Sequence, residues 1–291
     1  MQDLEQVNTK YYNYFTTPSG IECSLYEITN KEYLVLLKFL QSENFTGFFK
    51  CLDCFIKRTI KDFDNFLYID KIYTYIAFAF YNIKPNVSIS HPKLGPTDLS
   101  LTNLLGDIES AFVSKAEIIE INDSIKIKIH YARKFHYEAD TPIVDYDTCI
   151  CEIAKNGEWQ KISPVEASQL MEVLDTQTAS KIEIKARNAF NNKINIFKLP
   201  MMNPVYADTN SADMLYLVCS LFKENLQNYY TELYIATHYM KMDKYGFDTL
   251  TPVEMSIVLK IMEEDKEKQN KQSKNKGGMA IPSAISEDTL L

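Results

Sequence analysis

The sequence is poor in glycine and proline, with 8 and 10 in 291 residues, which argues against a collagenous, low-complexity or glycine-rich phosphate-binding architecture. It contains no G-x-x-x-x-G-K, G-x-G-x-x-G or G-x-S-x-G motif, and so lacks the glycine loops that bind phosphates or present a nucleophilic serine. No two histidines have the H-x-x-x-H or H-E-x-x-H spacing of a metal-binding helix. These absences favour a protein that is not an enzyme and that uses no cofactor.

Long apolar runs and excess positive charge are also missing. The most apolar run, residues 72–83, is far shorter than the roughly 20 residues that cross a bilayer, and residues 1–5 are polar, unlike a signal peptide. The formal net charge is -8, which disfavours nucleic acid as a partner because phosphate binding needs a basic face. We therefore expect a soluble, cytoplasmic protein. Its hydrophobic content of 46 % is enough for a globular core.

Hydrophobic periodicity predicts an α+β fold with a helical N-terminal region. The capping box Thr29-Asn30-Lys31-Glu32 begins the first helix, because Thr29 can accept a first-turn amide and Glu32 can reach back to the Thr29 amide. Residues 1–20 are predicted to be irregular, and Pro85 to end the third helix. The other elements predicted in residues 1–135, which we take as one domain, are strands over 20–28 and 87–91, helices over 29–40, 48–60, 69–81 and 101–112, and a turn over 92–96.

The pattern then changes to the alternation that is typical of strands. Residues 117–121 and 125–131 alternate around Asp123-Ser124 and predict a β-hairpin in a small antiparallel sheet. In the mixed segment 136–200, residues 148–153 and 159–162 are predicted to pair across Asn156-Gly157. Ser163-Pro164-Val165-Glu166 predicts the start of a helix, with Ser at the N-cap, Pro at the first position and Glu at the third.

The loop 200–210 is predicted to separate this segment from an all-α C-terminal module, residues 201–270. Before the loop, residues 178–199 fit either a helix or a strand, and we favour a helix over 179–190 followed by a strand over 193–198. After the loop, helices are expected over 212–225, 229–242 and 255–270, and the first two of these are compatible with one bent helix. Residues 271–291 are rich in Lys, Gln, Asn, Ser and Gly, cannot form a core, and are predicted to be a disordered tail.

Four cysteines have spacings that are compatible with a metal site. Cys51 and Cys54 would share one face of a helix, and Cys149 and Cys151 one face of a strand. Four thiolates would hold a structural zinc ion if the two elements met. The competing interpretation, which we favour, is that all four are small apolar side chains on core faces, with no bound metal.

The densest aromatic stripe lies near the C-terminus, at Tyr229, Tyr230, Tyr234 and Tyr239. Such a stripe can pack internally against the last helix. It can also provide anchors at a protein–protein interface, where tyrosine is enriched. We expect these four residues to contact a partner.

The order of these segments resembles a family of assembly proteins from contractile-tailed bacteriophages, those of the tail baseplate and its central hub. The resemblance covers the capped helix 29–40 followed by 45–60, the stretch 66–70 leading into 72–83 and the strand 87–89, and the Tyr229-Tyr230-x3-Tyr234 helix followed by 250–255. Where that family ends a helix in Arg and a Ser-Gly-like turn, this sequence has Phe80-Tyr81-Asn82.

The resemblance implies a structural or chaperone-like role in virion assembly in the host cytoplasm. The implied partners are other tail proteins, and the chain itself as a homo-oligomer. The alternative from another class is a metal-stabilised or nucleic-acid-associated intracellular protein, which would use the four cysteines and the lysine-rich tail.

Overall fold

The computed structural model describes residues 12–83, 86–91, 95–138, 141–155, 157–191, 193–195, 208–210, 214–223 and 225–276. The chain forms two compact units, Met1–Pro252 and Val253–Leu291. Within the described ranges, no helix is both long enough and apolar enough to cross a membrane. Predictions for Pro85, for residues 92–94, for most of the loop 200–210 and for residues 277–291 lie outside the described residues.

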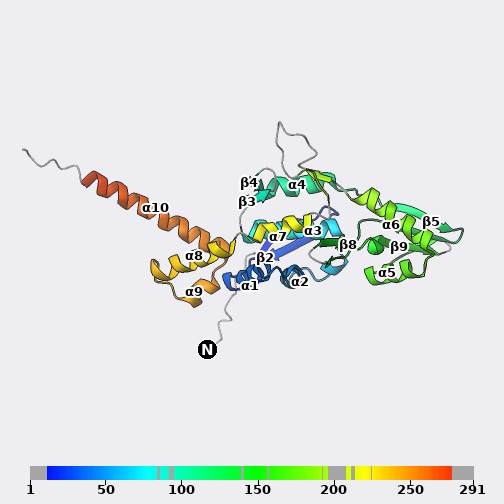
Figure 1. Ribbon diagram of the computed structural model, residues 1–291, viewed down its shortest axis with the longest axis horizontal. Coiled ribbons are helices and arrows are strands. Elements are labelled where there is room, and N and C mark those ends of the chain that lie inside the picture. The colour runs from blue at the N-terminus through cyan, green and yellow to red at the C-terminus, as the bar shows by residue number, and fades with distance from the viewer. Residues whose placement is uncertain are drawn as a thin grey trace, which may run out of the picture. The chain divides into compact units, whose positions relative to one another are not determined.

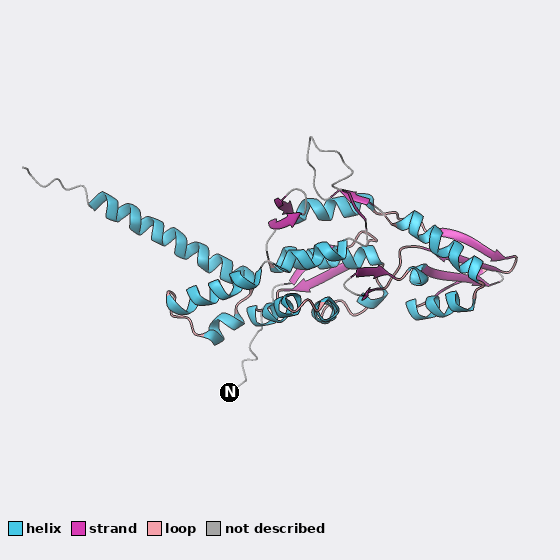
Figure 2. Ribbon diagram, in the orientation of Figure 1, coloured by secondary structure: helices cyan, strands magenta, loops and turns pink. Residues whose placement is uncertain are grey.

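The fold is α+β, with short antiparallel sheets and a mostly helical C-terminal region (Figures 1 and 2). The helices are α1 (Asn30–Gln41), α2 (Phe45–Ile56), α3 (Tyr68–Asn82), α4 (Leu101–Ala111), α5 (Pro164–Val173), α6 (Thr176–Phe190), α7 (Met214–Lys223), α8 (Asn225–His238), α9 (Lys244–Thr249) and α10 (Pro252–Lys276). Two 3-10 helices, η1 (Phe63–Asn65) and η2 (Tyr146–Cys149), complete the helical part of the described chain.

A four-stranded antiparallel sheet has the order β10-β9-β6-β5, and the other described strands pair as β1-β2, β3-β4, β7-β8 and β11-β12. The strands are β1 (Tyr12–Thr16), β2 (Glu22–Tyr26), β3 (Asn86–His91), β4 (Gly95–Ser100), β5 (Glu117–Asn122), β6 (Ile125–Ile129), β7 (Phe135–Glu138), β8 (Thr141–Val144), β9 (Ile150–Lys155), β10 (Glu158–Lys161), β11 (Lys193–Asn195) and β12 (Asp208–Asn210).

The strongest local signals in the sequence are confirmed. Thr29 and Glu32 form the predicted capping box at the start of α1, and Ser163 and Glu166 form a second one before α5. β5 and β6 form the predicted hairpin, and the side chain of Asn122 accepts the amides of Ser124 and Ile125 at its turn, 3.0 and 2.9 Å away. β9 and β10 pair as expected.

Helix α3 forms the centre of the first unit, because nearly all of its residues, on every side of the helix, are buried. Two polar side chains on α3 hold the turn of the β1–β2 hairpin and the segment that leads from the hairpin to α1. The Asp70 carboxylate accepts the Ser19 amide at 3.0 Å, and the Asn82 side-chain oxygen accepts the Ile28 amide at 2.7 Å. Both contacts satisfy groups that would otherwise be buried without partners.

Helix α7 also belongs to this core, where the structure differs from the domain division expected at 200–210. α7 packs against both α1 and α3 (Figure 1). Phe222 is fully buried, and its ring meets that of Phe48 edge-on, with centroids 5.3 Å apart. The proline-containing loop therefore does not separate α7 from the N-terminal helices, because the apolar face of α7 is buried against them.

Several short elements were predicted incorrectly. β1 lies in a stretch that was expected to be irregular, and β4 begins inside the region predicted as a turn. β12 lies within the predicted loop 200–210, Thr148 and Cys149 are in η2 rather than in a strand, and residues 271–276 of the predicted tail continue α10. Helix α2 ends at Ile56. Position 224, between α7 and α8, lies outside the described residues, so the single bent helix stays a prediction. The strands β1, β4 and β12 are short, and each forms only together with its paired strand.

A buried arginine connects the end of β6 to the segments that follow it. The Arg133 guanidinium donates to the carbonyl oxygens of Thr148 (3.1 Å), Ile150 (2.6 Å) and Ile162 (2.6 Å). The Arg133 carbonyl in turn accepts a hydrogen bond from the Lys71 ammonium. One side chain thus joins η2, β9 and the approach to α5.

Candidate functional site

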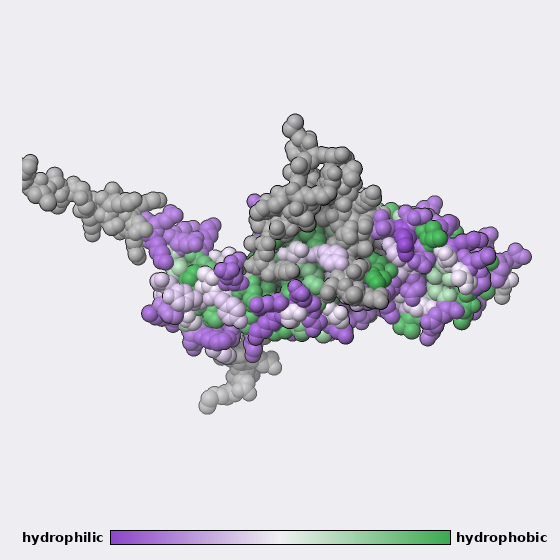
Figure 3. Space-filling model, viewed as in Figure 1, coloured by the Kyte–Doolittle hydropathy of each residue, from purple (hydrophilic) through white to green (hydrophobic). Residues whose placement is uncertain are grey.

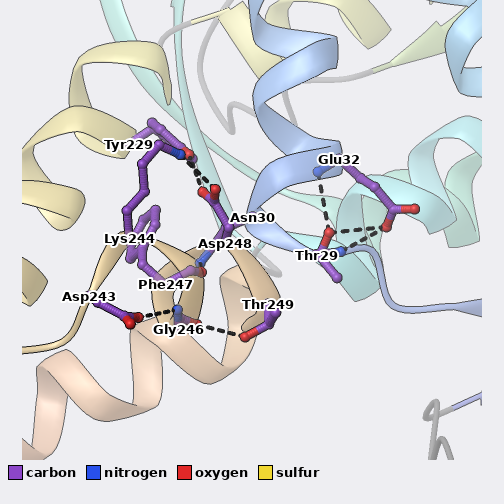
Figure 4. A network of polar contacts seen from close by, with 10 residues as sticks. All are labelled: Thr29, Asn30, Glu32, Tyr229, Asp243, Lys244, Gly246, Phe247, Asp248 and Thr249. Carbon is purple, nitrogen blue, oxygen red and sulfur yellow. Dashed lines mark hydrogen bonds and ion pairs between the residues drawn. The ribbon is translucent and has the colours of Figure 1, made fainter.

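The predicted tyrosine stripe lies on and just after α8, and the start of α1 holds the adjoining α9 region in place. Asn30, the first residue of α1, is buried. Its backbone amide donates to the Leu250 carbonyl at 2.7 Å. Its side-chain amide donates to the Phe247 carbonyl at 3.0 Å (Figure 4). Two hydrogen bonds from one residue thus fix the end of α9 against α1.

Short-range contacts shape α9 itself. The Asp243 carboxylate caps the helix by accepting the Gly246 amide at 2.7 Å, and the Thr249 hydroxyl donates to the Gly246 carbonyl at 2.8 Å. Lys244 forms an ion pair with Asp248 at 2.6 Å. These contacts, seen together in Figure 4, place the Asp248 carboxylate next to α8.

Tyr229 is buried where α8 packs against α9. It is only 2 % exposed, its ring meets that of Phe247 edge-on at 5.3 Å, and its hydroxyl donates to Asp248 at 3.3 Å (Figure 4). Burial, together with the negative charge of Asp248, raises the pKa of the Tyr229 hydroxyl above its ordinary value. Tyr229 therefore joins α8 to α9, and it is not available to a partner as the sequence had suggested.

The other three tyrosines are accessible: Tyr230 is 50 %, Tyr234 52 % and Tyr239 61 % exposed. We call these three residues the tyrosine face. Tyr230 and Tyr234 are one helical turn apart on α8. The Tyr234 ring stacks on His238 with centroids 4.1 Å apart and meets the Tyr239 ring edge-on at 6.2 Å. Figure 3 shows pale, weakly hydrophilic residues over α8 and α9, bordered by strongly hydrophilic ones.

A hollow lies beside the tyrosine face, where α8 approaches the end of α1. Its volume is about 620 Å³, and it is lined by Leu40, Gln41, Glu43, Leu226, Gln227 and Tyr230. The tyrosine face thus offers ring surface and hydroxyl groups next to a depression of mixed polarity. Such a surface can take up a protruding side chain of another protein.

Replacing Tyr229 and Tyr234 separately should distinguish the internal tyrosine from the exposed ones. Tyr229→Ala should lower the free energy of unfolding by about 3 kcal/mol, because it leaves a cavity beside Phe247. Tyr234→Ala should change it by no more than about 0.5 kcal/mol, because the ring is half exposed. Urea denaturation followed by circular dichroism measures both values. Equal losses in the two variants would contradict this assignment.

The structure does not bring the four cysteines of the suggested zinc site together. Cys51 and Cys54 lie on α2, Cys149 is at the end of η2, and Cys151 is on β9. Among the described residues, no three His, Cys, Asp or Glu side chains gather as they would around a metal ion. Burial raises the pKa of Cys51 to about 11 and that of Cys149 to about 12, so both are thiols rather than thiolates near neutral pH.

Comparison with known proteins does not assign this chain to a family or a fold. The chain matches no protein-family model, no curated protein and no solved structure. The function must therefore be argued from the residues and contacts of this chain.

Sequence reasoning identified the tyrosine stripe but missed the residues that hold it. Asn30 and Phe247 are 217 positions apart, so no local pattern predicts their contact. A weak signal was present at Asp243, which stands three residues before Gly246 as an N-cap residue would. Tyr229 and Tyr230 are adjacent, and only the position of α9 determines which of them is buried.

Proposed function

We propose that this protein is a non-enzymatic structural or assembly protein of a bacteriophage tail baseplate or hub, and that it binds other tail proteins through the tyrosine face. The observation that carries the proposal is the exposure of Tyr230, Tyr234 and Tyr239 beside a helix pair that buried contacts hold in place. The proposed role in a phage tail rests on the order of the sequence segments, which resembles that of the baseplate and hub family.

The tyrosine face should bind a partner at a low cost in conformational entropy. A tyrosine side chain supplies a large contact area with few rotatable bonds, so it loses little conformational entropy on binding. The helix that carries Tyr230 and Tyr234 is already ordered through Tyr229, Asp248 and the neighbouring α9. A preorganised surface of this kind loses less free energy to ordering than a flexible one does.

Affinity capture from infected cells tests the proposal. The tagged protein, purified from cells infected with the phage that encodes it, should retain tail proteins that mass spectrometry identifies. The double variant Tyr230→Ser with Tyr234→Ser should lose them. A matched control, Val173→Ser, alters an exposed apolar residue on α5 and should retain them. The proposal fails if no tail protein is captured, or if capture is the same in the double variant.

A further inference from the structure

A second, separate cavity lies between α2, the start of α3 and β7. Its volume is about 340 Å³, at the small end of the range of ligand pockets. The residues that matter for its chemistry are Phe49, Lys50, Asp53, Lys71, Lys134 and Tyr137. None of them belongs to the tyrosine face.

Lys71 is the most unusual of these residues, because it is a lysine that is only 7 % exposed. Its ammonium group donates to the carbonyl oxygens of Asp64, at 3.0 Å, and of Arg133. An ammonium has three protons to donate, and among the described residues the third has no hydrogen-bond acceptor. Burial lowers the pKa of Lys71 to about 8. An anion in the cavity would satisfy the third donor and favour the charged amine.

The charges that border this cavity are unevenly balanced. Lys50 and Lys134 are exposed, and neither forms an ion pair within the described ranges. Of the two acidic residues that line the cavity, Asp64 is neutralised by Lys57 at 2.6 Å. Asp53 accepts the Tyr75 hydroxyl at 2.7 Å, and burial raises the pKa of its carboxyl group. A chain with a net charge of -8 thus has a cavity with a local excess of positive charge.

One wall of the cavity is aromatic. The rings of Phe49 and Tyr137 stack at a centroid distance of 5.4 Å and an angle of 21°. Phe135 also lines the cavity, and it meets Phe49 edge-on at 5.3 Å. A flat apolar group can pack against such a wall while an attached anion reaches the lysines.

We propose that this cavity binds a small organic anion in which a flat apolar group carries one phosphate or carboxylate. Lys50 and Lys134 attract the anion at the mouth, and Lys71 donates its third hydrogen bond to it. Lysine suits this role because it acts as a compact positive charge toward phosphate and carboxylate oxygens. Asp53 opposes the anion by charge repulsion.

Calorimetric titration of the full chain with phenyl phosphate, benzoate and inorganic phosphate tests this proposal. At least one of the two aromatic anions should bind, and more tightly than inorganic phosphate, because only they contact the ring wall. Which of the two binds more tightly identifies the anionic group. The double variant Lys50→Gln with Lys134→Gln should weaken binding by about tenfold or more. Both substitutions are on the surface and should leave the fold intact.

One further variant completes the test. Lys155→Gln, an exposed change on β9, should leave affinity unchanged. Absence of binding by both aromatic anions, or an unchanged affinity in the double lysine variant, would overturn the proposal.

Discussion

Replacement of Arg133 by methionine should be among the most destabilising single changes in this chain, with a loss of at least about 3 kcal/mol in the free energy of unfolding. The variant keeps a long apolar side chain but removes three hydrogen bonds to the carbonyl oxygens of Thr148, Ile150 and Ile162. A buried carbonyl oxygen that loses its hydrogen-bond donor destabilises the folded state by its full desolvation free energy. Arg133 is itself buried, so water does not readily replace the guanidinium.

Urea denaturation of the purified variant measures this loss. Arg133→Lys should fall between the wild type and Arg133→Met, since one ammonium cannot reproduce a planar fork of donors that points in three directions. Arg187→Met is the matched control, because Arg187 is exposed and forms a surface pair with Glu183. It should cost no more than about 0.5 kcal/mol. A similar loss in Arg133→Met and Arg187→Met would contradict the role assigned to Arg133.

Phe222→Ala should cost about 3–5 kcal/mol, the usual range for removing a fully buried aromatic ring. Phe222 lies on α7 and contacts Phe48 on α2 and Tyr33 on α1, with ring centroids 5.3 and 6.5 Å apart. The truncation therefore leaves a cavity between α7 and the N-terminal helices. Denaturant unfolding that is monitored separately by tyrosine fluorescence and by far-ultraviolet circular dichroism measures the loss and shows whether the unit unfolds cooperatively.

The control for this prediction lies on the same helix. Tyr216→Ala removes an aromatic ring from the more exposed side of α7, where the side chain is 40 % exposed. Its cost should be well below that of Phe222→Ala. A small loss in Phe222→Ala, or a separate transition for residues after 210, would instead support a boundary in the loop 200–210.

The sequence predicts elements whose signals are local. The two capping boxes, the hairpin at Asp123-Ser124 and the pairing of β9 with β10 each depend on residues within a few positions of one another. The packing of α7, the contacts of Arg133 and the bond from Asn30 to Phe247 join distant parts of the chain. Periodicity shows that an element has an apolar face, but not which other element covers it.

The same distinction applies to the candidate site. Composition and spacing pick out the four tyrosines, yet Tyr229 and Tyr230 are neighbours with opposite surroundings. Which ring faces inward is decided by Phe247 and Asp248, which lie on another helix. The anion cavity had no sequence signal, because its lysines come from α2, α3 and the segment before β7.

Site-specific photocrosslinking tests the central claim, that the protein acts through the tyrosine face, most directly. A photoreactive phenylalanine analogue replaces Tyr234 in one variant and Val173, which is exposed on α5, in another. After irradiation of infected cells, the claim predicts a covalent adduct between position 234 and a tail protein, and none from position 173. Adducts from both positions alike, or none from position 234, would contradict it.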